Sequence, residues 1–149
     1  MKRSCKLIEL DEGLNGLFIE LLNELHDSGV PFHRNAVFYI DEKNENDIRE
    51  KLLKDGNKKR LRRILATIIQ GKDRPDLYGI EDVSSKTKGI KAMKFTGGDR
   101  GNLRIYCKEY LISKQLRIVM VWTHYKKSQR VSGQLKDKIE SIGGYEYEF

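Results

Sequence analysis

The sequence contains few of the residues that build disulfide-linked or metal-bound scaffolds. Only two of its 149 residues are cysteines, and Cys5 and Cys107 lie too far apart for a CxxC or zinc motif. Free thiols are therefore expected, with a single disulfide as the minor alternative. The three histidines, His26, His33 and His124, are scattered singly. Their spacing indicates neither a metal site nor a cofactor.

Long hydrophobic runs are also lacking. No apolar run approaches the ~18 residues that a membrane-spanning helix needs. The first residues, MKRSCKLIEL, contain no apolar stretch of the kind found in signal peptides, and the acids Asp11 and Glu12 follow directly. A cytoplasmic protein is therefore expected. The length suits a single domain over residues 1–149 with one hydrophobic core.

Positive charge is present in excess, but only in one part of the chain. Residues 1–85 hold 15 Lys and Arg against 16 Asp and Glu, whereas residues 86–149 hold 14 against 6. The formal net charge of +7 therefore comes from the C-terminal part. A concentrated basic region favours a polyanion as partner, either a nucleic acid or an acidic protein. A generally solvated basic surface is the alternative reading.

Apolar spacing predicts mainly helices in the first half of the chain. A short strand is expected at 6–10, and a helix in LNGLFIELLNELHDSG, stopped by Ser28 and Gly29, has Leu14, Phe18 and Leu21 on one face. Residues 32–40 fit a strand, and a second helix follows in DEKNENDIREKLL. A third helix spans KKRLRRILATIIQG, whose basic first turns are either a solvated face or an additional phosphate-contacting surface.

The second half changes to strands. Three β-like runs, 90–95, 102–110 and 116–125, are joined by connections short enough for antiparallel hairpins. SGQLKDKIESIGG predicts a short helix with Ser132 as its cap, and YEYEF fits an edge strand. The predicted fold class is α+β, with N-terminal helices packed on a C-terminal antiparallel β-meander and a short C-terminal helix.

Alternation along 102–110 separates two sets of side chains. Leu103, Ile105 and Cys107 share one face, which we expect to pack beneath the helices. Arg104, Tyr106 and Lys108 share the other face, which we expect to be the free side of the sheet. On the next strand, His124 and Tyr125 should lie on opposite faces.

These polar residues are suited to cleaving RNA without a metal. The 2′-hydroxyl of RNA can attack the adjacent phosphate if the protein supplies a base, an acid and cations. His124 titrates near neutral pH, and Tyr125 or a C-terminal tyrosine could assist. Arg104 has the planar fork that binds two phosphate oxygens. A serine or cysteine nucleophile is rejected, because no GxSxG motif exists and Cys107 is expected to point into the core.

The C-terminal part of the chain resembles a known family. Its strands IKAMKFTGGDRG, NLRIYCKEY and RIVMVWTHYKKSQR, followed by a helix, are similar to the RelE/HigB superfamily of type II toxins, particularly the HigB-like branch. The matching residues are an Arg-hydrophobic-Tyr strand and a Lys-Lys-Ser turn, namely Arg104, Ile105, Tyr106, Lys126, Lys127 and Ser128. The resemblance implies a RelE-like fold and a toxin that cleaves mRNA in association with the ribosome. It also implies a cognate antitoxin protein as partner.

The resemblance also implies roles for single residues. Arg104 matches the phosphate-binding arginine, and His124 and Tyr125 resemble a histidine–tyrosine pair used for proton transfer. The family places basic residues toward RNA at Lys94, Arg100, Lys126 and Lys127. From their own positions in the chain, Tyr106, Lys108 and Arg130 are also expected to contact RNA or phosphate. The chain is longer than typical members, with 29–57 as an insertion or extra element, and its His-Tyr pair precedes a helix and a tail.

Two further readings remain open at this level. One is a non-catalytic module on the same scaffold that binds RNA or a protein, such as a degenerate toxin or a mobile-element accessory protein. The other is a structural homodimer, in which the basic face of one copy meets the acidic segment 41–50 of the other.

Overall fold

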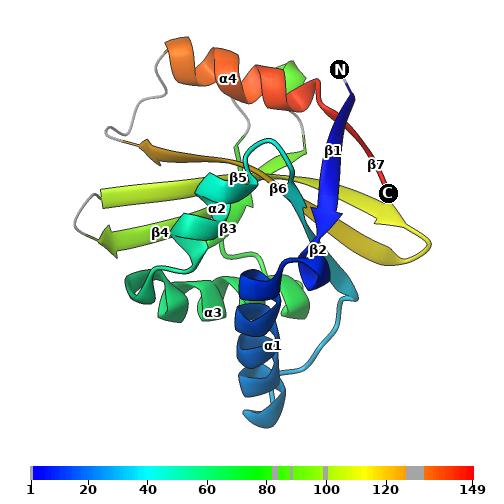
Figure 1. The fold of residues 1–149 in the computed structure, drawn as a ribbon, viewed down its shortest axis with the longest axis vertical. Helices are drawn as coiled ribbons and strands as arrows, with labels where there is room; N and C mark the ends of the chain where they lie inside the picture. Colours follow the sequence, from blue (N-terminus) through cyan, green and yellow to red (C-terminus); the bar gives the residue numbers. More distant parts are fainter. Residues whose placement is uncertain (1, 82–83, 88, 99–100, 127–132) are drawn as a thin grey trace.

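The structure, a computed structural model, describes residues 2–81, 84–87, 89–98, 101–126 and 133–149 (Figure 1). The helices are α1 (Glu12–Asp27), α2 (Glu45–Leu52), α3 (Asp55–Gln70) and α4 (Gly133–Gly143), with short 3-10 turns at Ile8–Leu10 and Ser85–Thr87. The strands are β1 (Lys2–Leu7), β2 (Ala36–Asp41), β3 (Tyr78–Ile80), β4 (Ile90–Gly98), β5 (Gly101–Ile112), β6 (Gln115–Lys126) and β7 (Glu146–Glu148). Across these ranges no helix has both the length and the apolar character to cross a membrane.

All seven strands join one mixed sheet, in the order β3-β4-β5-β6-β2-β1-β7. Neighbours from β3 to β6 are antiparallel, as are β1 and β2. Two pairs are parallel, β2 with β6 and β1 with β7. Helices cover both faces, with α1 and α3 on one side of the sheet and α4 on the other (Figure 1).

The predicted fold class is wrong. The strand predictions at 90–95, 102–110 and 116–125 are confirmed as β4, β5 and β6. The sheet, however, is mixed and larger than a meander, and its strands and helices are interspersed along the chain. The reason is that β2, from the stretch regarded as extra, pairs in parallel with the middle strand β6. Two neighbouring parallel strands must be joined by a long crossover connection, and the chain from β2 to β6 starts this crossover with α2 and α3.

Helices α1 to α3 enclose the larger hydrophobic core. Leu14 and Phe18 of α1 and Leu61 of α3 are fully or nearly fully buried against the sheet. Their sheet partners include Leu103, Ile105 and Cys107, so the prediction that these three pack beneath the helices is confirmed. Each buried side chain of this size contributes ~1.5–3 kcal/mol through removal from water.

Helix α4 forms a second core on the opposite face. Its Ile139 and Ile142 are fully buried, and they pack with Tyr106 and Val119 from the sheet. The expectation that Arg104, Tyr106 and Lys108 occupy a free side of the sheet is therefore wrong. The Lys108 ammonium also donates hydrogen bonds to the carbonyls of Gly143, 3.1 Å away, and Tyr145, where α4 ends. A cation at this end of a helix is favoured by the helix dipole.

A bulge in β6 determines which of its residues face α4. Tyr106 pairs with Trp122, but Cys107 pairs with Met120, so Val121 is the extra residue. The carbonyl of Val121 accepts a hydrogen bond of 2.7 Å from the side-chain amide of Asn44. Such a bulge locally rotates the strand. As a result, Val121 and Trp122 both contribute to the α4 side of the sheet.

The start of α1 is held by a partly buried ion pair, in which the carboxylate is buried and the guanidinium is partly exposed. The Asp11 carboxylate caps the helix at the backbone N–H of Leu14 and accepts hydrogen bonds from the Arg49 guanidinium, with Nε at 2.8 Å. Hydrogen bonding to Arg49 is the main cause that lowers the pKa of Asp11 to about 2, against an ordinary value of 3.8. A carboxyl with a lowered pKa stabilises the fold only while it is ionised.

The free energy of unfolding should therefore fall in acid as the Asp11 carboxyl becomes protonated. The stabilisation is present above about pH 4 and is lost as the pH falls through about 2, because the native carboxyl must then be protonated. Urea unfolding of wild type and Asp11→Asn near pH 6 and near pH 2 measures the effect. We expect the acid-induced loss to be smaller in Asp11→Asn by about 1–2 kcal/mol. Equal losses in both proteins would show that the pair contributes no pH dependence.

Candidate active site

A row of three basic side chains crosses the sheet on the α4 side. In the strand register, Lys94 of β4 lies opposite Arg104 of β5, and Arg104 lies opposite His124 of β6. Directly opposite residues in antiparallel strands share a face, with Cβ atoms ~4.5–5.5 Å apart. The face is the one covered by α4, since Arg104 precedes the buried Tyr106 by two residues. We call Lys94, Arg104 and His124 the basic row.

A buried carboxylate completes the site. Oε1 of Glu81 lies 2.8 Å from Nη1 of Arg104 and 4.0 Å from Nζ of Lys94. The side chain of Glu81 is only 10% exposed and that of Arg104 only 14%. Sequence reasoning missed Glu81, which follows β3 in a polar connection with no periodic pattern. No sequence signal places it beside Arg104.

Positive charge remains in excess at the basic row. Burial is the main cause that lowers the pKa of Lys94; Arg104 and Lys126 lower it further, whereas Glu81 opposes them. Asp76 also raises the pKa of Lys94. Three cations, Lys94, Arg104 and Lys126, therefore act on one another near two carboxylates. A phosphate group would relieve this repulsion, so the site is electrostatically suited to a phosphodiester.

Two buried polar atoms of the site have no hydrogen-bond partner among the described residues. They are Nε of Arg104 and the hydroxyl oxygen of Tyr106. Burial also raises the pKa of Tyr106 well above its ordinary value, so its hydroxyl remains protonated near neutral pH. Tyr106 can therefore donate a hydrogen bond here, but it is unsuited to act as a base.

An aromatic stack holds the histidine. The ring of Trp122 stacks on Tyr106, with centroids 5.7 Å apart, and on His124, with centroids 5.1 Å apart. From α4, Nζ of Lys138 lies 5.2 Å from the centre of the Trp122 ring. A stacked imidazole has few orientations available, which favours defined proton transfer. The role of Trp122 was also missed, although its spacing of two from His124 on one strand was a usable signal.

The structure separates Tyr125 from the basic row. Tyr125 lies on the opposite face, as the alternation predicted, and packs against the core beneath α1 to α3. Its ring is 5.8 Å from Nζ of Lys51 of α2. In this arrangement Tyr125 is not placed to share proton transfer with His124.

The remaining candidates divide into three groups. Lys126 lies two residues after His124 on β6, on the same face of the sheet, and is opposite Asn102 in the strand register. Tyr106 and Lys108 are engaged beneath and at the end of α4. Arg100, Lys127 and Arg130 lie outside the residues that the structure describes, as do Ser128 and the expected cap Ser132.

The basic start of α3 mainly serves the fold. Nζ of Lys58 lies 2.8 Å from Glu20, and Nε of Arg62 lies 3.2 Å from Glu24, so both cations bind acids of α1. Arg60 donates to the carbonyl of Lys94 with its Nε at 2.9 Å. These contacts leave the basic row as the better candidate for phosphate binding.

Comparisons with known proteins give no match to any family model, curated protein or solved structure. The function is therefore inferred from the sequence motif and from the geometry of the basic row.

Proposed function

We propose that the protein is a toxin-type endoribonuclease that cleaves mRNA at the basic row without a metal ion. The observation that carries the proposal is the register that aligns Lys94, Arg104 and His124 on one face of three adjacent strands. The resemblance of residues 90–149 to RelE/HigB toxins supports the same reading. Under this proposal the ribosome presents the mRNA, and a cognate antitoxin protein neutralises the activity.

The proposed reaction is an internal displacement at phosphorus. The 2′-oxygen of RNA forms a bond to the phosphorus, and the bond from phosphorus to the 5′-oxygen breaks. The products are a 2′,3′-cyclic phosphate and a 5′-hydroxyl. Arg104 and Lys94 stabilise the charge on the non-bridging oxygens. His124 and Glu81 are the groups of the site suited to exchange the two protons, one leaving the 2′-hydroxyl and one reaching the 5′-oxygen.

The test is induced expression in bacteria of wild type, Arg104→Ala and His124→Ala, with growth and mRNA cleavage as readouts. We expect the wild type to arrest growth, and we expect either substitution to restore growth. Equal soluble amounts of the three proteins serve as the control for folding. Intact mRNA and normal growth with the wild type, together with no cleavage on isolated ribosomes, would refute it. RNA binding without cleavage would instead favour the non-catalytic module.

RNA affinity should fall steeply as salt increases. Each phosphate neutralised by a lysine or arginine releases condensed counterions, with a slope of about −0.7 per contact on single strands. Titration of a labelled RNA at several salt concentrations gives this slope. Lys126→Ala should reduce the number of contacts by about one. A salt-independent affinity would indicate that the basic region serves a protein partner.

A further inference from the structure

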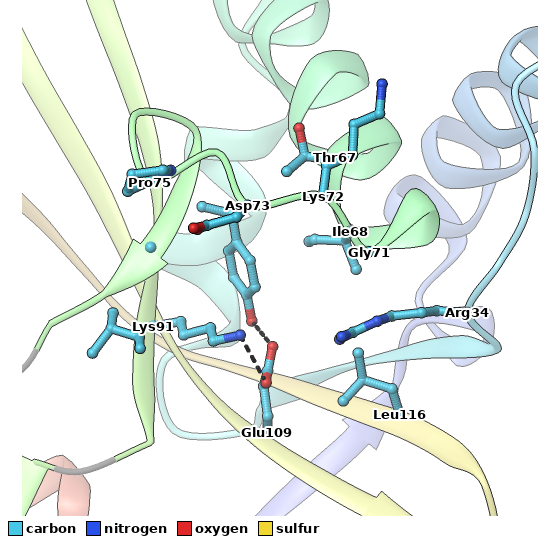
Figure 2. A pocket seen from close by; sticks show the side chains of 13 residues that line it. Arg34, Thr67, Ile68, Gly71, Lys72, Asp73, Pro75, Lys91, Glu109 and Leu116 are labelled. Carbon is cyan, nitrogen blue, oxygen red and sulfur yellow. Dashed lines mark hydrogen bonds and ion pairs between the residues drawn. The ribbon is translucent and has the colours of Figure 1, made fainter.

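A second polar site lies on the sheet face opposite the basic row (Figure 2). A cavity of about 340 Å³ opens between the end of α3, β3 and β4. A neighbouring cavity of about 470 Å³ shares three of its lining residues, Arg34, Glu109 and Leu116. We call the two cavities together the Glu109 groove. Their size is in the range of small-ligand sites, ~300–1,000 Å³.

The strand pattern places the groove on the α1–α3 side. Lys91 alternates with Ile90 and Ala92, which belong to the core under α4. Glu109 follows Cys107 by two residues, and Cys107 belongs to the core under α1 to α3. Lys91 and Glu109 therefore face away from the basic row.

Glu109 is the fixed acceptor of the groove. Its Oε2 accepts a hydrogen bond of 2.6 Å from the hydroxyl of Tyr78, and its Oε1 lies 3.3 Å from Nζ of Lys91 (Figure 2). Burial raises the pKa of Tyr78, so this hydroxyl remains a donor near neutral pH. A carboxylate has about four lone-pair sites. Glu109 therefore retains capacity to accept from a ligand.

Arg34 supplies a positive charge that the groove does not neutralise. Its guanidinium points across the cavity toward Glu109 (Figure 2). Among the described residues it has no hydrogen-bond or ion-pair partner. Gly71, where α3 ends with φ 68°, leaves room for it, because a Cβ there would lie 2.9 Å from Nε of Arg34. The planar fork is suited to two oxygens of a phosphate.

The turn between β5 and β6 provides an independent indication. Ser113 and Lys114 have φ of 51° and 66°, the left-handed region that favours glycine. A non-glycine residue in this region costs roughly 1–2 kcal/mol, and asparagine–glycine is the usual solution for such a turn. Lys114 lines the second cavity together with Arg34. Retained backbone strain is typical of functional positions.

We propose that the Glu109 groove binds a ribonucleoside monophosphate whose base carries an amino group. Arg34 and Lys114 hold the phosphate. The base lies against the apolar walls formed by Ile68 and Leu116, and its amino group donates to Glu109. Guanine, cytosine and adenine each carry an exocyclic amino donor for a carboxylate, and guanine adds a ring N–H beside its amino group. Uracil fits poorly, because its single ring N–H lies between two carbonyl oxygens that the carboxylate repels.

The test is calorimetric titration of the full chain with guanosine, cytidine and uridine monophosphates and with inorganic phosphate. We expect the guanine or cytosine nucleotide to bind with a Kd below ~1 mM. Uridine monophosphate and inorganic phosphate should bind at least about tenfold more weakly, because neither has an amino group to donate to Glu109. Absence of saturable binding at ~10 mM, or equal binding of all four probes, would overturn the proposal.

Variants locate the binding. Arg34→Ala, at an exposed position, should weaken affinity at least about tenfold. Lys114→Gly should weaken affinity too, while it raises stability by relieving φ strain. Arg74→Ala, which removes an exposed cation paired with Asp76, is the matched control. Affinity unchanged in Arg34→Ala would overturn the assignment. Arg104→Ala should bind the nucleotide normally. Nucleotide binding in the groove can therefore be tested separately from the proposed RNA cleavage.

A competition experiment distinguishes the two sources of such a nucleotide. A single-stranded RNA tetranucleotide that displaces the bound nucleotide, in an Arg34-dependent manner, would show that the groove takes a nucleotide of an RNA chain. Failure to displace it would show that the groove takes the free nucleotide. Both results presuppose that the groove binds the nucleotide through Arg34.

Discussion

Replacing Asp41 with alanine is expected to lower the free energy of unfolding by about 3–5 kcal/mol. Asp41 ends β2 and is fully buried. Its carboxylate binds the Arg3 guanidinium, with Nε at 2.7 Å and Nη2 at 3.0 Å. It also accepts from the hydroxyl of Tyr147 and from the backbone N–H groups of Lys43 and Asn44, at 2.9 and 3.1 Å. One side chain thus joins β1, β2, β7 and the start of α2.

The size of the effect follows from the groups that would be left without a partner. The Arg3 side chain is only 8% exposed, so the substitution leaves a buried cation without its carboxylate. The Tyr147 hydroxyl and the Lys43 N–H lose their acceptor as well. The Asn44 N–H, in contrast, keeps the main-chain carbonyl of Asp41 at 3.2 Å. Burial is the main cause that raises the pKa of Tyr147, and burial remains in the variant, so ionisation of this hydroxyl does not relieve the loss.

Urea unfolding measures this prediction. Glu42→Ala, at the exposed neighbouring position, is the control and should change stability by less than ~0.5 kcal/mol. The double variant Arg3→Met/Asp41→Ala should recover part of the loss, because it also removes the unpaired cation. A loss below ~1 kcal/mol for Asp41→Ala would mean that the two chain ends are not held through this carboxylate.

Replacing Arg104 with alanine is expected to slow RNA cleavage by at least about 100-fold. The guanidinium is the central member of the basic row and is positioned by Glu81 at 2.8 Å. Its charge matters most in the transition state, when negative charge develops on the phosphate oxygens. The rate should therefore fall more than the RNA affinity does. Arg104→Lys should be intermediate, since lysine retains the charge but lacks the planar fork.

Single-turnover cleavage of an end-labelled RNA, with affinity measured in parallel, separates these effects. Because Arg104→Ala leaves the buried Glu81 without its main partner, the stability of each variant must be measured and assays run well below its unfolding midpoint. Arg62→Ala removes a cation of the same type from α3, where it binds Glu24 of α1, and should cleave normally. If Arg104→Ala cleaves within about threefold of wild type, the basic row is not the catalytic site.

Local pattern predicted much of this molecule, but pairing between distant segments was not predictable. Alternation located β4, β5 and β6 and assigned Leu103 and Arg104 to opposite faces. The pairing of β2 with β6 and of β1 with β7 joins segments far apart in the chain. No periodic signal specifies such partners. For this reason the sequence led to a meander with one open face, where the structure has a sheet covered on both faces.

The candidate site was predictable in part for the same reason. Arg104 and His124 were found from residue type and strand position, and the register makes them direct neighbours. The bulge at Val121 changes the alternation along β6. It could not be predicted, because the residues around it are all apolar and show no alternating pattern. Glu81 reaches Arg104 only through tertiary packing of a connection without periodicity. Tyr125 was a candidate to assist His124, but alternation already predicted that it faces away from His124.

The most direct test of RNA cleavage by 2′-oxygen attack uses one pair of oligonucleotides. The first is an RNA containing a mapped cleavage site, and the second is identical except for a 2′-deoxy sugar on the 5′ side of the cleaved bond. Both are incubated with purified protein and ribosomes, and the new ends are analysed. If the 2′-oxygen is the attacking atom, we expect the RNA to be cut to a 2′,3′-cyclic phosphate and a 5′-hydroxyl, while the deoxy-substituted strand binds equally well and stays intact. Cleavage of the deoxy-substituted strand, or no cleavage of either strand, would contradict it.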